Sequence, residues 1–317
     1  MQAPVSVWDG NMDPDAVPES TWRNVDAVLT TNLYGMPDRV VELRRHCDEL
    51  GIPLIEDAAH AIGTHVDGQR IGTFGNAAAF SLSKHVAGLA GGFLAVEDAR
   101  TRRELELLRD DLLVPGRLRA DLAVTLRPLA RSSVRALHLV RPVWRTMQRL
   151  GLLERDAFRM ALQTPRLNGC AREAPSLAAF EPWVRVDLHG FRERHGPVVR
   201  GQLTLRLSRL DSAAHDGPPP LFRVPFLVDD RDALVERLVL HGMVCGYVYD
   251  PPLDDYAGAQ FVEPSPDPSA ARWFASHVLP VDPHLARRAT GALTKERASA
   301  AFPDPVPDLK PRMPLGQ

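Results

Sequence analysis

The chain contains very few cysteines, and the three that it has, Cys47, Cys170 and Cys245, lie far apart. A sparse and odd-numbered set does not form the disulfide framework of a small secreted domain, and it favours a reducing compartment. No apolar run is long enough to cross a bilayer. The first residues also lack the basic stretch and apolar core of a secretory signal. We therefore expect a cytoplasmic protein.

The chain also lacks an excess of charge of either sign. Its 38 Lys and Arg residues nearly balance its 40 Asp and Glu residues, which gives a formal net charge of −2. This balance does not indicate a nucleic-acid partner. A hydrophobic content of 44% and a charged content of 25% are ordinary for a globular protein, and 317 residues suit two domains or one large one.

Motifs for metal binding and for hydrolysis are missing as well. His46 and Cys47 are adjacent, so they point to different sides of a helix and cannot chelate one ion together. Neither Cys-x-x-Cys nor His-x-x-x-His spacing occurs nearby, and Gly-x-Ser-x-Gly is absent. We predict no metal site and no hydrolytic nucleophile.

The N-terminal half alternates between short apolar runs and amphipathic segments. Strands are predicted at 27–35, 52–57, 77–83 and 91–97, helices at 37–51 and 98–113, and a hairpin that turns at Asp67-Gly68 within 65–72. Pro37 at the start and Gly51 at the end are the usual boundaries of a helix. Strand–helix–strand order predicts an α/β fold with a parallel sheet.

The remainder of the chain predicts a smaller α+β C-terminal domain. A helix is expected at 199–211, followed by a strand–helix–strand unit at 221–228, 231–242 and 243–250, then a strand-like turn and a last helix within 271–293. We assign 1–200 to a large domain, 201–294 to the small domain, and 295–317 to a disordered Pro-rich tail.

The segment 117–149 is rich in arginine and has almost no opposing acid. Arginines recur every fourth residue in two sets, at 127, 131 and 135 and again at 141, 145 and 149, so each set lies along one face of a helix. A solvated helix face explains this pattern most simply. The other interpretation is a helix that makes weak contact with an anionic membrane surface or a polyanionic substrate. We treat 115–165 as an Arg-rich helical insertion in the large domain.

Two residues of opposite charge are candidates for binding a cofactor. Asp57 follows an apolar strand, where ligands bind in open α/β sheets, although a helix cap is a common role for such a residue. Lys84 lies among small residues, which is unusual because burying an ammonium group is costly, but an exposed loop lysine is also possible. Pyridoxal phosphate needs one acid for its ring nitrogen and one amine for its aldehyde. Ser81 could donate its hydroxyl to a phosphate oxygen or serve only as a turn residue.

Residues 32–98, about a fifth of the chain, closely resemble the DegT/StrS-type sugar aminotransferases in the order and spacing of these motifs. The resemblance implies a three-layer α/β/α transferase domain and pyridoxal phosphate bound covalently to Lys84 as an internal aldimine. By the same resemblance, Asp57 pairs with the pyridine nitrogen, His60 packs beside the ring, and Ser81 binds the phosphate. The implied reaction transfers an amino group from an amino acid such as glutamate to a nucleotide-linked keto sugar, in a homodimer.

The chain departs from this family at several points. The resemblance begins partway into the family's large domain, which is therefore incomplete, and the Gly-Thr loop that cradles the phosphate is not found. Asn32 stands where members usually carry His. Two alternatives remain open: a non-catalytic relative without cofactor, and one part of a split enzyme that acts as an interaction module.

Overall fold

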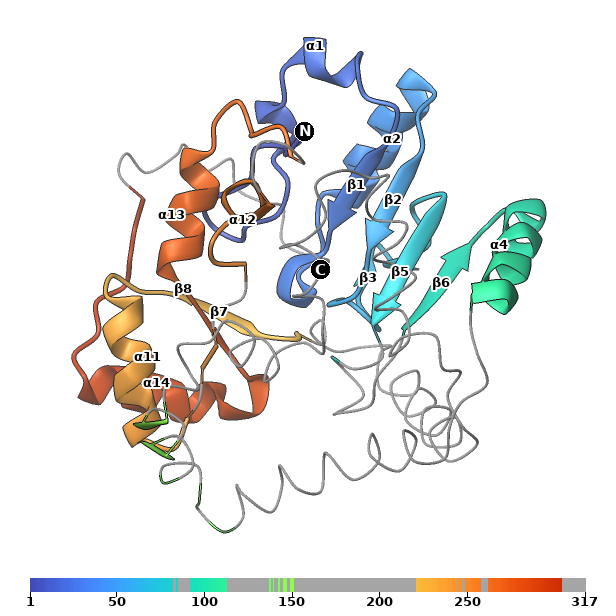
Figure 1. Cartoon of the computed structure of the whole chain (residues 1–317). Helices are drawn as coiled ribbons and strands as arrows, with labels where there is room; N and C mark the ends of the chain where they lie inside the picture. Colours follow the sequence, from blue (N-terminus) through green and yellow to red (C-terminus); the bar gives the residue numbers. More distant parts are fainter. Residues whose placement is uncertain are drawn as a thin grey trace. The chain divides into compact units, whose positions relative to one another are not determined.

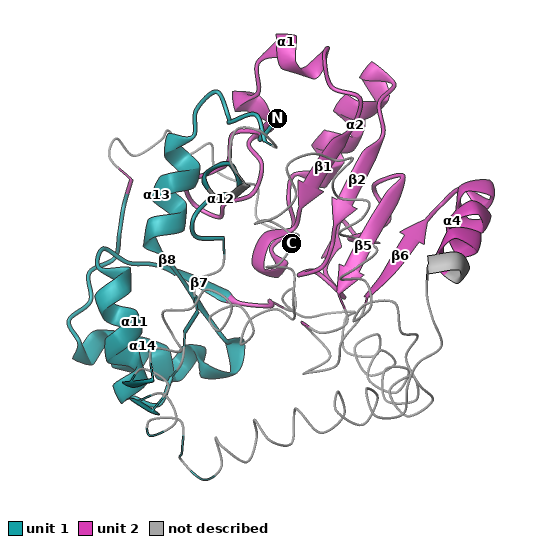
Figure 2. Ribbon diagram, viewed as in Figure 1, with its two compact units in different colours: residues 1–2, 129–191, 224–302 teal, residues 3–128, 192–223, 303–317 magenta. Residues whose placement is uncertain are grey.

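The computed structural model describes residues 1–81, 84, 92–112, 221–243, 245–246, 249–257 and 262–303, with a few single positions between 137 and 150 (Figure 1). The chain divides into two compact units (Figure 2). The sheet unit comprises residues 3–128, 192–223 and 303–317, and the C-terminal unit comprises 1–2, 129–191 and 224–302. The arginine-rich segment 117–149 lies outside the described residues apart from those single positions, as does the helix expected at 199–211.

The sheet unit is built on a four-stranded sheet in the order β1-β2-β5-β6 (Figure 1). Its strands are β1 (Val28–Thr31), β2 (Leu54–Asp57), β5 (Ala77–Ser81) and β6 (Gly92–Val96). The first three are parallel, as predicted, whereas β6 runs antiparallel to β5. The predicted hairpin is formed by β3 (His65–Val66) and β4 (Gln69–Arg70). The α/β fold expected from the sequence is therefore present.

Helix α2 (Val40–Leu50) connects β1 to β2 and begins later than the predicted Pro37. Asp38 accounts for this delay, because its carboxylate accepts hydrogen bonds from the Thr30 hydroxyl and the Arg39 amide, while its own N–H donates to Asn32. These bonds hold the chain against β1 before the helix starts. Gly51 ends the helix in the left-handed conformation, as the sequence predicts.

One face of the sheet is covered by α2. Leu43 and Cys47 of the helix pack with Val28 and Leu54 of the strands in one buried cluster. Side chains alternate along a strand, so Leu29 and Ile55 point to the opposite face, where they are 62% and 37% exposed. The remaining described helices of this unit are α1 (Glu19–Trp22), α4 (Ala99–Leu112) and the 3-10 helices η1 (Pro14–Ala16) and η2 (Leu33–Gly35).

The C-terminal unit contains an antiparallel pair of strands, β7 (Val224–Leu227) and β8 (Val278–Val281). Its helices are α11 (Arg231–Leu240), α12 (Leu253–Ala257), α13 (Ser269–His277), α14 (Ala286–Lys295) and the 3-10 helix η3 (Pro283–Leu285). Leu234 and Leu238 of α11 pack with Leu279 of β8 and Ala289 of α14 in the core of this unit.

Two expectations for this unit are wrong, and one is met only in part. No described residue of 243–250 is in a strand: Met243 and Cys245 are buried in the core, and Tyr249 has the left-handed φ of 63°. The alternation there reflects burial rather than strand pairing. Within 271–293, the expected strand-like turn and last helix correspond to β8 and α14, whereas residues 271–277 belong to α13, which the sequence did not predict. Residues 296–303, assigned to a disordered tail, are ordered, since Ala300 bridges to Val228 and Ala301 is buried.

Among the described helices, none has both the length and the apolar character needed to span a bilayer.

Candidate functional site

Asp57 is the last residue of β2, between β1 and β5 in the described sheet. Its backbone carbonyl accepts a hydrogen bond from the Asn32 amide, and its Oδ1 atom accepts one from the Ala59 amide at 2.9 Å. No helix follows, so Asp57 is not a helix cap; residues 58–64 form turns. The half-buried carboxylate therefore lies at the carboxyl edge of the sheet, as predicted.

The preceding residue, Glu56, points to the opposite face and is fully buried. Its carboxylate accepts hydrogen bonds from the amides of Gly72, Phe74 and Gly75, at 2.6–2.8 Å. Glu56 thus fixes the loop between β4 and β5, and of the two adjacent acids only Asp57 points away from this loop.

His60 is buried next to the turn that follows β1. Its Nδ1 atom accepts a hydrogen bond from the Tyr34 amide at 3.2 Å, which leaves the ring proton of the neutral imidazole on Nε2. The Tyr34 ring lies nearly parallel to the His60 ring, with 6.2 Å between centroids and 9° between planes. The orientation of His60 is therefore fixed by the backbone of Tyr34.

The turn at Tyr34-Gly35 requires its glycine. Gly35 has a φ of +93°, and a Cβ atom there would lie 2.9 Å from the His60 carbonyl oxygen and 3.0 Å from both Leu221 Cα and Phe222 N. Any side chain would push these groups apart. The turn, the His60 backbone and residues 221–222 are therefore closely packed.

Lys84 is half-buried and lies within electrostatic reach of Asp57 and Arg223. Burial lowers the pKa of its ammonium group below the usual 10.5; the Asp57 carboxylate opposes this shift, and the positive charge of Arg223 adds to it. Its Nζ atom lies 5.7 Å from the centre of the Phe222 ring. Lys84 is therefore not an exposed loop lysine.

Ser81 is the last residue of β5 and pairs with Gly92 of β6. Because Ala79 is in register with Asp57, Ser81 lies on the same face as Asp57, two residues farther along its own strand. The half-buried hydroxyl is thus at the same edge and face of the sheet as the carboxylate.

The sequence did not indicate that Phe222 and Arg223 lie at this site. The Phe222 ring stacks on the His60 ring, with 4.5 Å between centroids and 27° between planes, and the Arg223 guanidinium lies 4.2 Å from the Phe222 centroid. The amides of both residues donate to the Tyr34 carbonyl, at 2.8 and 3.3 Å. They are far from Asp57 in sequence, and the only local signal is an aromatic–arginine pair just before a strand.

Asn32 does not point toward Asp57. It is buried on the face that α2 covers, where its Oδ1 atom accepts the Asp38 amide. Its role in the described structure is to hold the start of α2.

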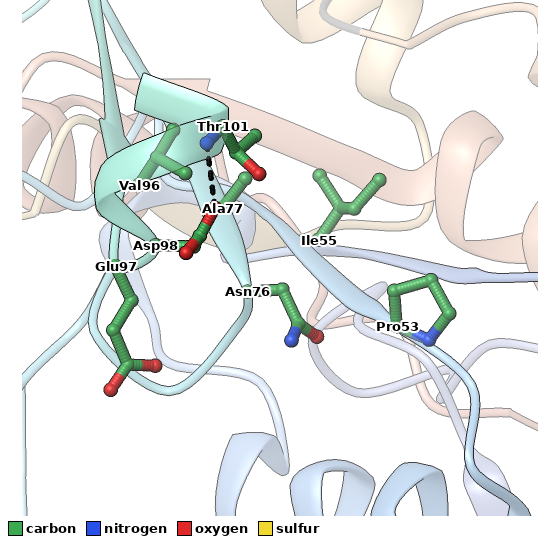
Figure 3. Close-up of a pocket in the computed structure, with 8 residues that line it drawn as sticks. All are labelled: Pro53, Ile55, Asn76, Ala77, Val96, Glu97, Asp98 and Thr101. Carbon is green, nitrogen blue, oxygen red and sulfur yellow. Dashed lines mark hydrogen bonds between the residues drawn. The ribbon is translucent and has the colours of Figure 1, made fainter. Parts of the chain in front are cut away.

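A separate hollow of about 490 Å³ lies at the other edge of the sheet, near the amino ends of β2 and β5 (Figure 3). Its charged lining residues are Glu97 and Asp98, and Asp98 accepts the Thr101 amide. A hollow with two acids and no basic side chain does not suit a phosphate group. Within the described residues, no group of three or more His, Cys, Asp or Glu side chains is placed to hold a metal ion.

Part of the chain is similar in sequence to a known protein family. Residues 3–117 match the model of the DegT/DnrJ/EryC1/StrS aminotransferase family. The chain is 40% identical over 74 residues to GDP-perosamine synthase of Vibrio cholerae, which is 23% of this chain and 20% of that protein. It is 38% identical over 114 residues to the putative pyridoxal phosphate-dependent aminotransferase EpsN of Bacillus subtilis, which is 33% of this chain and 29% of that protein. The matches thus span less than a third of these relatives' length.

Solved structures share the fold over most of the described chain. The aminotransferase TlmJ of Streptoalloteichus hindustanus matches with a TM-score of 0.56 and 18% identity, over 93% of this chain and 71% of that one. A DegT DnrJ EryC1 StrS aminotransferase from Brucella abortus matches with a TM-score of 0.54 and 14% identity, over 93% and 73%. Residues 3–117 are therefore similar in sequence to the DegT/DnrJ/EryC1/StrS aminotransferase family, and the fold of the chain resembles that of the two solved structures.

Proposed function

We propose that this protein is a pyridoxal-phosphate-dependent aminotransferase that acts on a nucleotide-linked keto sugar, with an amino acid such as glutamate as donor. The family match at residues 3–117 and relatives such as GDP-perosamine synthase support the reaction class. The observation that carries the proposal is the convergence of Asp57 and Lys84. An acid at a strand end and a desolvated amine lie within electrostatic reach of each other.

The chemistry of this donor set fits pyridoxal phosphate. When bound, the cofactor supplies a carbonyl carbon for amines and an electron-withdrawing ring that stabilises negative charge on a substrate carbon. Asp57 would hold the protonated ring nitrogen, His60 would pack beside the ring, and Ser81 would donate to the phosphate. Lys84 would provide the amine. These four residues lie in the sheet unit.

The environment of Lys84 suits both of its proposed roles. Because burial lowers its pKa, a larger fraction of the amine is unprotonated near neutral pH than in an exposed lysine. The unprotonated Nζ atom can attack a carbonyl carbon. It can also accept a proton from a substrate carbon and return it to another position.

Binding of pyridoxal phosphate tests the proposal directly, since the chain has only three lysines, Lys84, Lys295 and Lys310. We expect the visible absorption band of lysine-bound pyridoxal phosphate in the wild type and in the exposed control Lys295→Ala, but not in Lys84→Ala. Borohydride reduction and peptide mass spectrometry should then place the adduct on Lys84. Its absence from the wild type at every cofactor concentration would reject the proposal for this chain.

The substrate class requires its own assay. Formation of 2-oxoglutarate from glutamate should depend on an added nucleotide-linked keto sugar and should not occur with the free sugar. Equal rates with a simple keto acid would contradict the sugar assignment while leaving transamination intact.

A non-catalytic role is the second candidate, and one observation favours it. The ring that packs against His60 in this structure is the chain's own Phe222. A protein that had lost its cofactor could retain the fold with this position filled. A wild-type protein that never binds pyridoxal phosphate would support this alternative.

A further inference from the structure

Phe222 occupies a central position in the candidate site. Its ring is stacked on His60 and lies 5.7 Å from the Lys84 amine. The Phe222 amide donates to the Tyr34 carbonyl, and the Tyr34 amide donates to the His60 ring. The backbone of one residue therefore positions both stacked rings.

A cofactor ring would need the same space. To bond with Lys84 through its aldehyde and to contact Asp57 through its nitrogen, a pyridine ring must lie within reach of both side chains. A phenyl ring has nearly the same size and flatness as a pyridine ring. Two six-membered rings cannot occupy one position against His60, so one of them has to leave.

We propose that Phe222 closes the cofactor site in the free protein and is displaced when pyridoxal phosphate binds. This inference rests on the proposed function. Phe222 competes with the cofactor for the face of His60, and the exchange of one ring for the other opens the site. Arg223 follows Phe222 in the chain and shares its hydrogen bond to the Tyr34 carbonyl, so displacement of Phe222 also disturbs the position of Arg223.

The expected effect follows from the contact that is lost. An aromatic pair contributes about 0.5–1.5 kcal/mol beyond the area that it buries. Removing the competing ring should therefore tighten cofactor binding by about 2- to 12-fold. In the wild type, ring displacement precedes binding, so the observed association rate should level off at high cofactor concentration. In Phe222→Ala it should keep rising with concentration.

The experiment measures binding without relying on activity. Apo wild type, Phe222→Ala and Phe222→Leu are titrated with pyridoxal phosphate by absorbance and with 4-deoxypyridoxine 5-phosphate, which lacks the aldehyde, by calorimetry. The exposed Phe302→Ala is the matched control. We expect tighter binding of both compounds to Phe222→Ala, an intermediate affinity for Phe222→Leu, and no change for Phe302→Ala. The leucine variant keeps apolar bulk in case the alanine variant does not fold.

The outcomes separate this inference from the proposed function. If the wild type binds and both Phe222 variants bind equally well or more weakly, Phe222 does not compete with the cofactor and the inference is overturned alone. If neither the wild type nor any variant binds, the proposed function fails and the inference fails with it.

Discussion

The pKa of Lys84 depends on burial and on two neighbouring charges. Burial lowers its pKa, the Asp57 carboxylate raises it, and Arg223 lowers it further. The balance of these three influences sets the fraction of unprotonated amine at a given pH. Substitution of either neighbour should therefore move the titration of Lys84 in a known direction.

We predict opposite shifts for the two neighbours. Asp57→Asn removes the charge that raises the pKa of Lys84, so the pKa should fall. Arg223→Gln removes a charge that lowers it, so the pKa should rise. Competitive labelling of lysines with acetic anhydride across pH, read by peptide mass spectrometry against exposed Lys295, measures the midpoint without any cofactor. Asp67→Asn, on the exposed hairpin turn, is the control and should change nothing. Shifts in the same direction would contradict this account.

Asp38 should make the protein's stability depend on pH. Burial raises the pKa of its carboxyl to about 6, against hydrogen bonds from Thr30 and Arg39 that favour the ionised form. An acid that binds its proton more tightly when folded stabilises the fold at low pH. That stability is lost as pH rises from about 4 to about 6. Two pKa units correspond to about 3 kcal/mol.

We predict that Asp38→Asn flattens this part of the stability profile. Urea denaturation at closely spaced pH values between 4 and 7 measures the slope of the unfolding free energy. The exposed helix residue Asp48 gives the matched control, since Asp48→Asn leaves the buried carboxyl in place. An unchanged slope in Asp38→Asn would assign the pH dependence to other groups.

At the scale of single elements, side chains along β2 alternate between the two faces of the sheet, so the adjacent acids Glu56 and Asp57 point to opposite faces. Glu56 turns toward the loop at 72–75, and Asp57 turns to the other face. The sequence alone shows only two neighbouring carboxylates at the end of a strand. Their different roles follow from the alternation of side chains.

We predict that Glu56→Gln destabilises the sheet unit by about 2–4 kcal/mol. The carboxylate accepts hydrogen bonds from three backbone amides, whereas the glutamine side chain has a single acceptor oxygen. Its NH₂ group would face N–H donors and could not bond with them. Chemical denaturation measures the cost. Glu49→Gln removes a carboxylate from an exposed ion pair on α2 and should cost less than about 1 kcal/mol. Similar costs for both would show that the buried hydrogen bonds contribute little.

The elements predicted well are those whose local signals agree with their packing. Helix α2 has its glycine at the end, and β1, β2 and β5 are short apolar runs between turn residues. The start of α2 was missed because Asp38 bonds to β1, a contact invisible in local sequence. The prediction of a strand at 243–250 was wrong because Met243 and Cys245 are buried at alternate positions, which gives the same apolar pattern as a strand. Phe222 and Arg223 were missed because only the fold brings them to His60.

At the scale of the whole molecule, the described sheet has two unlike faces. Leu54 is fully buried beneath α2, whereas Leu29 of the adjacent strand and Leu94 of β6 are 62% and 61% exposed. Parallel sheets usually have both faces covered. Leucines on the second face contribute little to the stability of this chain.

We predict a large difference between two otherwise similar substitutions. Leu54→Ala should cost about 2–5 kcal/mol because it leaves a cavity in the core. Leu29→Ala should stay within about 0.5 kcal/mol and should reduce the binding of a hydrophobic dye. Urea denaturation and dye fluorescence measure the two effects. A cost for Leu29→Ala close to that of Leu54→Ala would mean that this face is covered in solution.

The hydrogen bonds to the Tyr34 carbonyl make opening of the candidate site measurable by hydrogen exchange. It accepts the amides of Phe222 and Arg223, and Tyr34 itself is fully buried. When the backbone at 222 moves away from Tyr34 together with the ring, the Phe222 amide is released from this carbonyl and becomes free to exchange its hydrogen with the solvent. Deuterium uptake at that single amide would therefore report those openings of the site in which the backbone moves, in the resting protein, before any ligand is added.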